Sequence, residues 1–166
     1  MRRWLLLMFM FLSVAAVAQP DRVYKSLKDV SDPEEVYILR LRGKRLKRIP
    51  PQVYGMTNLR ELDLQCNRIA SLSDSIVLLA NLERLVLSRN PIDSLPPVMA
   101  GMEQLRELVL WSTRVTSLPK EFAGLDGTLE LLDLRSCRLL LDEQEAIEAL
   151  LPSVRKLWDY ACNCPD

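Results

Sequence analysis

The sequence contains no histidine, few aromatic residues and no excess of either charge. Its 166 residues include 22 Lys and Arg, 22 Asp and Glu, and only 6% aromatics. Without histidine, Ser-His-Asp and Cys-His catalysis, His-ligated metal sites and histidine-based pH switching are excluded. The balanced charge argues against general nucleic-acid binding, which usually accompanies a strong basic excess. These absences favour a binding protein that is not an enzyme and uses neither a cofactor nor a metal.

A long apolar run is absent everywhere except at the N-terminus. There, two arginines precede the apolar stretch 4–12, and a small-residue Ala-Val-Ala segment ends at residue 18, as in a secretory signal peptide. The stretch 4–18 is fifteen residues long, whereas a helix needs about 20 to cross a bilayer. We therefore expect residues 1–18 to be a cleaved signal peptide. The mature protein would be exported, periplasmic or secreted, with no membrane span.

What the sequence does have is a repeat. One unit reads Leu59-x-x-Leu62-x-Leu64-x-x-Asn67-x-Ile69, and similar units start at residues 36, 82, 105 and 129. The Leu-x-Leu alternation has a period of two, so it predicts a short strand with one face turned inward. A single unit cannot bury its own apolar face, and stacked neighbours bury these faces jointly. The interior row of the stack is expected to contain Leu62, Leu85, Leu108 and Leu132.

This pattern, with Leu-Pro-x-x-hydrophobic in the second half of several units, resembles the leucine-rich repeat family and its small exported bacterial members. The resemblance covers roughly residues 36–141. It implies an α/β fold: a right-handed solenoid curved into a horseshoe, with a parallel β-sheet on the concave face and short helical or irregular convex segments. The expected organisation is a signal peptide (1–18), an N-terminal cap (19–35), five repeats (36–141) and a C-terminal cap (142–166). That last segment would contain a helix, a degenerate strand and a Cys-x-Cys tail.

The ninth position of each unit and the two ends carry polar signals. The ninth positions hold Lys44, Asn67, Asn90, Thr113 and Cys137. An inward asparagine amide there can satisfy backbone groups that would otherwise be buried without partners. Ser26 is expected to cap a short N-terminal helix, and Asp142 with Glu145 to form the capping box of a C-terminal helix.

Repeat geometry limits which of the four cysteines can pair. Cys66 and Cys137 would lie three strands apart, about 14 Å at ~4.8 Å per strand, which is too far for a disulfide. Cys137 is expected to be buried and Cys66 to be a partly exposed thiol. Cys162 and Cys164 form either a local disulfide or free thiols. Two thiolates without histidine do not complete a zinc site.

The outward strand positions, third, fifth and seventh in each unit, predict a binding site. Most are polar, but Val86, Val109 and Trp111 are apolar and fall on adjacent strands, so we expect one exposed apolar patch. The charged residues around this patch are Arg84, Arg89, Glu107 and Arg135. An apolar patch with a charged rim is typical of a protein-binding hot spot. The prediction is a protein partner whose identity, like the oligomeric state, the sequence does not specify. Alternatively, the valines merely suit strands and terminal segments cover Trp111.

Two basic features support a second interpretation. Six basic residues fall within the nine positions 40–48 of the first unit, and Arg45, Arg68, Arg114 and Arg138 share the tenth position, interrupted by Pro91. The first feature suggests recognition of an envelope glycan or another anionic polymer through the basic first repeat. The shortage of exposed aromatic platforms argues against it. We also expect no ubiquitin-ligase domain of the kind that some bacterial leucine-rich repeat proteins carry, because about 25 residues follow the last repeat.

Overall fold

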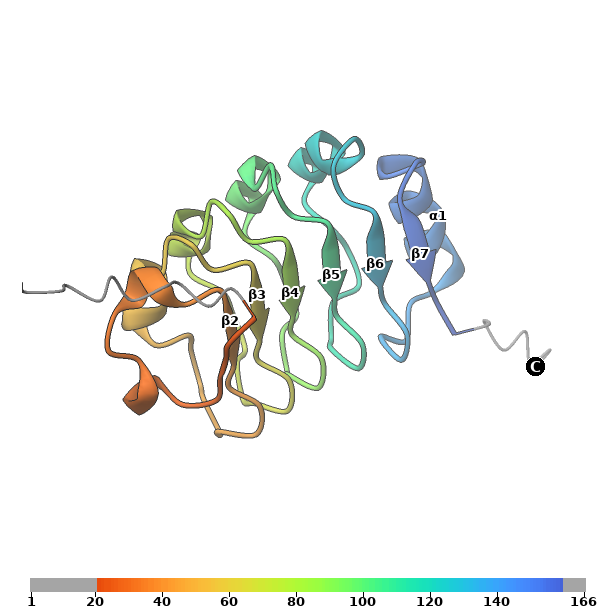
Figure 1. The fold of residues 1–166 in the computed structure, drawn as a ribbon. Helices are drawn as coiled ribbons and strands as arrows, with labels where there is room; N and C mark the ends of the chain where they lie inside the picture. The colour runs from red at the N-terminus through yellow and green to blue at the C-terminus, as the bar shows by residue number, and fades with distance from the viewer. Residues whose placement is uncertain (1–20, 160–166) are drawn as a thin grey trace, which may run out of the picture.

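Seven short parallel strands form one sheet in which the spatial order follows the chain order (Figure 1). The computed structural model describes residues 21–159. The expected signal peptide, 1–18, and both Cys162 and Cys164 lie outside these residues. The strands are β1 (Val23–Tyr24), β2 (Ile38–Arg40), β3 (Glu61–Asp63), β4 (Arg84–Val86), β5 (Glu107–Val109), β6 (Leu131–Asp133) and β7 (Arg155–Leu157).

The register of the sheet places the repeat leucines in one interior row. Leu62 pairs with Leu85, Leu85 with Leu108, and Leu108 with Leu132. All four are 0% exposed. Because side chains alternate across a strand, this row fixes which neighbours face outward. The predicted interior row is therefore confirmed.

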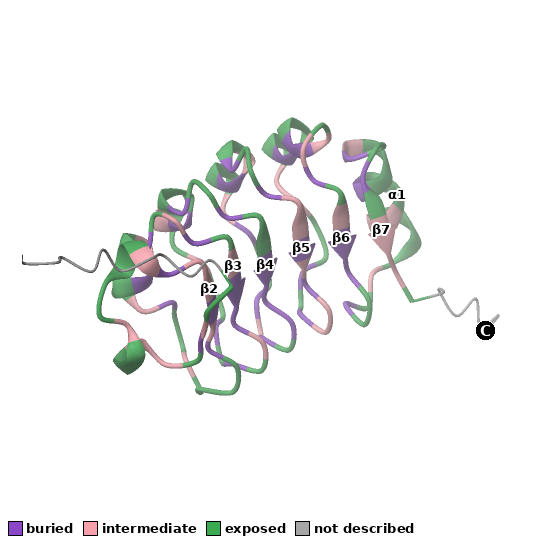
Figure 2. Cartoon of the chain, in the orientation of Figure 1, coloured by how far each residue is buried: buried purple, intermediate pink, exposed green. Residues whose placement is uncertain are grey.

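The strands β2 to β5 are each followed by a short helical segment on the outer arc of the horseshoe (Figure 1). These are the 3-10 helices η3 (Pro51–Gly55), η4 (Asp74–Leu78), η5 (Pro97–Gly101) and η6 (Lys120–Leu125). Three of them follow a proline, whose fixed φ suits the start of a helical turn and which has no N–H to offer a further strand. In Figure 2 the buried stretches follow the strands and the segments that lead to and from them. The fold class is as predicted, an α/β horseshoe with short convex helical segments.

Asparagines at the ninth position tie neighbouring units together as predicted. The Asn67 side chain accepts a hydrogen bond from the Leu46 N–H at 3.0 Å and donates to the Leu41 and Leu64 carbonyls at 2.8 and 2.7 Å. One unit later, Asn90 accepts from the Ile69 N–H and donates to the equivalent carbonyls. Cys137 is buried, as expected, and Cys66 is exposed. Cys66 and Cys137 do not form a disulfide with each other.

The residue before each ninth position turns the chain out of the strand. Its φ is positive in all five units, between 55° and 65°. These residues are Gly43, Cys66, Arg89, Ser112 and Ser136. In the second to fifth units this left-handed conformation directs the ninth side chain inward, whereas Lys44 of the first unit is exposed.

The N-terminal segment covers the first repeat with a strand and two short helices. The buried Tyr24 of β1 pairs with Leu39. The helices are η1 (Leu27–Asp29) and η2 (Pro33–Glu35). The Ser26 hydroxyl accepts from the Lys28 N–H at 3.2 Å, so the predicted cap is confirmed. The additional strand β1 was not expected from the repeat pattern.

At the opposite end, helix α1 (Leu141–Leu150) is followed by β7. The prediction of a capping box from Asp142 to Glu145 is wrong, because the helix begins earlier. Leu140 occupies the N-cap, and the Glu143 carboxylate accepts from its N–H at 2.7 Å. One carboxylate at the third helical position thus satisfies the free backbone donor without a polar side chain at the cap. The expected degenerate strand is present as β7, which pairs with β6.

Candidate functional site

The outward side chains of the sheet form three rows across the concave face. One row contains the third positions (Ile38, Glu61, Arg84, Glu107, Leu131), the next the fifth positions (Arg40, Asp63, Val86, Val109, Asp133), and the last the seventh positions (Arg42, Gln65, Ser88, Trp111, Arg135). Polar groups dominate the first two units. Apolar side chains enter the central row only at the third and fourth units.

The apolar patch predicted from sequence is smaller than expected. Val86 is only 6% exposed, and Val109 and Trp111 are half-buried. Val86 lies in register between Asp63 and Val109, and the side chains of these neighbouring strands flank it on both sides. Its prediction as an exposed residue is wrong for this reason. Val109 and Trp111 remain as the accessible apolar surface of the patch, and Val86 lies beside Val109 on the adjacent strand.

Arg89 packs against Trp111. Its guanidinium carbon lies 4.5 Å from the centroid of the indole ring, a cation–π geometry. Arg89 follows β4 in the left-handed conformation, and its N–H donates to the Trp111 carbonyl at 2.9 Å. The stacked pair holds the indole in one orientation while leaving part of it in contact with solvent.

The other predicted charged residues form ion pairs within the face. Arg84 contacts Glu107 on the adjacent strand at 2.6 Å. Arg135 donates two hydrogen bonds, at 2.9 and 2.7 Å, to the buried Asp133 carboxylate of its own unit. The hydrogen bond to Asp133 raises the pKa of Arg135 above its ordinary value. The structure thus places all seven predicted residues on β4 and β5 or directly after β4, β5 and β6, and it pairs Arg84, Glu107 and Arg135 within the face.

A buried carboxylate with an arginine cover also occurs on the other side of the centre. Asp63 is 0% exposed and accepts a hydrogen bond from Arg42. That hydrogen bond is the main reason why the pKa of Arg42 lies above its ordinary value. Because each buried carboxylate is paired and hydrogen-bonded, it does not carry an uncompensated charge. Val86 and Val109, which we call the valine centre, therefore lie between two acid–arginine pairs. These pairs are Asp63 with Arg42 and Asp133 with Arg135.

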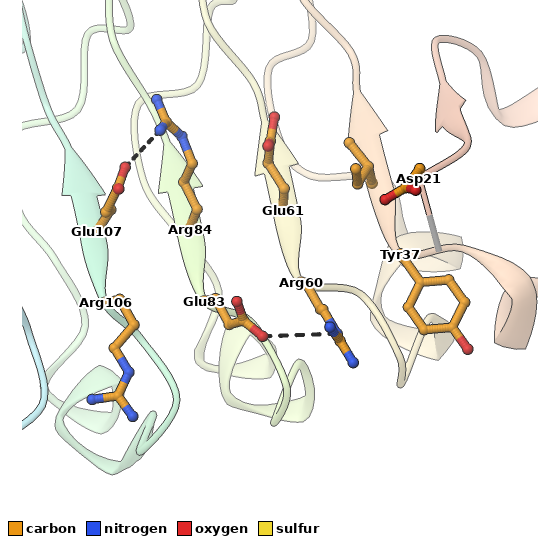
Figure 3. A pocket seen from close by; sticks show the side chains of 9 residues that line it. Asp21, Tyr37, Arg60, Glu61, Glu83, Arg84, Arg106 and Glu107 are labelled. Atoms are coloured by element: carbon orange, nitrogen blue, oxygen red, sulfur yellow. Dashed lines mark hydrogen bonds and ion pairs between the residues drawn. The ribbon is translucent and has the colours of Figure 1, made fainter. Parts of the chain in front are cut away.

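A groove of about 330 Å³ lies across the N-terminal ends of the strands (Figure 3). Its charged lining alternates in sign from unit to unit: Arg60, Glu83 and Arg106 at the second positions, and Glu61, Arg84 and Glu107 at the third. Arg60 lies 3.7 Å from Glu83. The sequence interpretation missed Arg60, Glu83 and Arg106 because it considered only odd strand positions. The signal that could have found them is the alternation of charge sign at the second position of successive units.

The fold and this face define a parallel β-solenoid with an open concave sheet. Residues 34–92 match the leucine rich repeat family. The strand register of the matched repeats continues through β5 and β6, beyond the matched residues. No curated protein matches the sequence significantly.

Solved structures with the same fold come from bacteria and plants. A leucine-rich repeat protein of Leptospira interrogans is 22% identical over 83% of this chain and 48% of its own, with a TM-score of 0.52. Internalin C2 of Listeria monocytogenes is 18% identical over 81% of this chain and 57% of its own, with a TM-score of 0.63. This chain thus spans about half the length of these two proteins.

A plant structure shows the same fold in a complex. It is the ectodomain of the membrane receptor kinase GASSHO1/SCHENGEN3 of Arabidopsis thaliana with CASPARIAN STRIP INTEGRITY FACTOR 2. This ectodomain is 23% identical over 82% of the present chain and 20% of its own, with a TM-score of 0.54. The likeness shows a shared fold.

Residues 21–159 lack two further features. Within this range, no group of three or more Cys, Asp or Glu side chains is placed to hold a metal ion. No helix in the same range combines the length and apolar character that crossing a membrane requires.

Proposed function

We propose that this protein is exported and binds a protein partner through the concave face of its sheet, without catalysis. The proposal rests mainly on Trp111, a half-buried indole beside Val109 whose orientation is held by Arg89. Tryptophan and arginine are enriched in hot spots, and burial of an already ordered indole costs little further side-chain entropy. The proposed contact residues are Val109, Trp111, Arg84, Arg89, Glu107 and Arg135, and Val86 packs beside Val109 in the same row.

The architecture supports this proposal in a second way. Curved solenoids expose an extended concave surface, and leucine-rich repeat proteins commonly serve as non-catalytic scaffolds for protein–protein interaction. Five repeat strands span only about 20 Å at ~4.8 Å each. A standard footprint of ~800 Å² per partner therefore extends beyond the valine centre, and the charged groove of Figure 3 is the adjoining surface.

The test compares two valines on opposite sides of the molecule. Val109 lies on the concave face, whereas Val98 is 42% exposed on the convex helix η5. Crosslinking and capture from the native compartment should recover the partner with wild type and with Val98→Asp, and lose it with Val109→Asp. Capture of the same protein by all three baits would contradict the proposed face.

A calorimetric titration with the captured partner then measures the contribution of the indole. Trp111→Ala should weaken binding by more than about 2 kcal/mol, roughly thirtyfold, while the circular dichroism spectrum stays unchanged. An unchanged affinity would remove Trp111 from the site.

Export is tested by the mature N-terminus. The proposed signal peptide ends at residue 18, so peptide mass spectrometry of protein recovered from outside the cytoplasm should find an N-terminal peptide that starts at Gln19 or its pyroglutamate form. Protein that begins at Met1 would contradict cleavage.

Recognition of an envelope glycan or anionic polymer through the first repeat is the alternative function. The structure reduces the number of cations available for it, because Arg40 and Arg42 pair with Glu61 and Asp63. Lys44, Arg45, Lys47 and Arg48 remain exposed. Retained polymer binding after neutralisation of these four residues would argue against this alternative.

A further inference from the structure

We propose that the rim of the sheet after β5 and β6 holds a binding site for a doubly charged tetrahedral oxyanion, phosphate or sulfate. The site is a hollow of about 820 Å³. Its lining includes two arginines, Arg114 and Arg138, and four hydroxyl residues, Ser112, Thr113, Thr116 and Ser136. This proposal does not depend on the protein-binding function of the concave face.

The repeat brings the two arginines together. Arg114 and Arg138 occupy the tenth position of successive units, two residues after the left-handed turns at Ser112 and Ser136. Because β5 and β6 pair in parallel, the loops that follow them run side by side at the lower edge of Figure 1. Adjacent strands lie about 4.8 Å apart, a spacing that lets two guanidinium groups contact one anion.

Both arginines are available for a ligand. The six ion pairs among residues 21–159 include neither Arg114 nor Arg138, and both side chains are exposed. This contrasts with Arg42, Arg84 and Arg135 on the face, which are paired with carboxylates. Two neighbouring cations without a carboxylate partner repel each other, and an anion between them relieves this repulsion.

The acidic side chain in the hollow is already engaged. Asp159 accepts a hydrogen bond from the Ser136 N–H. This bond holds the Asp159 carboxylate at the Ser136 backbone, and with Arg114 and Arg138 the charged lining of the hollow keeps a net positive charge. Guanidinium forks and hydroxyl donors match the geometry of phosphate and sulfate oxygens, which accept several hydrogen bonds at once.

The chain contains a matched control. Arg68 occupies the same tenth position in the second unit, is exposed, and belongs to none of the six ion pairs, but it does not line the hollow. An anion attracted only by the surface charge of the arginine column would respond equally to the loss of Arg68 and of Arg114.

The experiment is an NMR titration of the full mature chain at constant ionic strength. Inorganic phosphate, inorganic sulfate and acetate are added in separate series, and the arginine Nε–H signals are followed. We expect phosphate or sulfate to shift the Arg114 and Arg138 signals along one saturable curve, and acetate to bind more weakly. The difference between the phosphate and sulfate curves identifies the preferred anion.

Substitution decides whether the arginines form the site. Arg114→Gln and Arg138→Gln should each weaken binding about tenfold, the effect of losing one charge-assisted hydrogen-bond pair, and Arg68→Gln should leave it unchanged. Equal weakening by Arg68→Gln, or the absence of a saturable shift at Arg114 and Arg138, would overturn the proposal. Unchanged amide spectra elsewhere show that each variant is folded.

Discussion

At the scale of single residues, the strand ends show how the repeat tolerates an unfavourable conformation. The eighth position is left-handed in every unit, yet only the first unit has glycine there. For other residues this conformation costs about 1–2 kcal/mol because Cβ crowds the carbonyl oxygen. The second to fifth units adopt this conformation without glycine, and in each of them the turn directs the ninth side chain into the solenoid.

Cys66→Gly should therefore stabilise the protein. Cys66 is exposed, so its side chain contributes little packing, and its N–H bond to the Ser88 carbonyl needs no side chain. Removing the left-handed strain, less the extra entropy of an unfolded glycine, should raise the free energy of unfolding by about 0.5–1 kcal/mol. Urea denaturation should show a higher midpoint with an unchanged slope.

Cys66→Ser is the control, because it removes the thiol but keeps Cβ. It should leave the midpoint unchanged. A gain as large as that of glycine would mean that the thiol, rather than the backbone, is the destabilising group.

At the scale of elements, the ninth-position asparagines that bond to the backbone of the preceding unit form a ladder, and this ladder is incomplete in the C-terminal half. Asn67 and Asn90 each bridge two units, but their successor Thr113 contacts Cys137 Sγ at 3.4 Å instead. Cys137 donates to the Leu110 carbonyl at 3.2 Å, a weaker bond than an amide makes. The fourth and fifth units are therefore tied less strongly to their neighbours than the second and third.

Thr113→Asn should extend the ladder by one unit. By the register of Asn90, its amide would accept from the Ile92 N–H and donate to the Leu87 and Leu110 carbonyls. Each net hydrogen bond contributes about 0.5–1.5 kcal/mol, so we expect a gain of about 1–2 kcal/mol after the extra volume is accommodated. Hydrogen exchange should show stronger protection of the Ile92 amide.

Thr113→Val separates this effect from the loss of the hydroxyl. It should not increase Ile92 protection. If Asn and Val give the same exchange rate at Ile92, the asparagine does not bond that amide.

The sequence predicted the periodic elements better than the surface they form. The interior leucines and the roles of Asn67 and Asn90 were predictable because each follows from a spacing that recurs in every unit. The burial of Val86 was not, since it depends on side chains of two neighbouring strands. The groove was missed because strands of three residues leave the second position free to face the same side.

At the scale of the whole molecule, the chain is a one-dimensional stack. Each strand pairs only with its neighbours in sequence, and each convex segment packs mainly against the next. In such a stack, stability is approximately the sum of unit terms and nearest-neighbour interfaces. Adding an interior unit therefore adds one unit and one interface without disturbing the ends.

A duplication of residues 82–104, inserted before residue 105, tests this additivity. The copy has the 23-residue length of the first, second and third units, so its strand falls in register between β4 and β5. Its Leu85 would join the interior row. Urea denaturation should show a higher midpoint and a steeper slope, because more surface becomes exposed on unfolding.

The same duplication with Leu85→Asp in the copy alone is the control. A carboxylate in the interior row would be buried without a partner, so the added unit should remain outside the stack and lower the midpoint. If both duplications unfold with the slope of the natural chain, the inserted unit is an unfolded loop, and interfaces between neighbouring units do not suffice to recruit it.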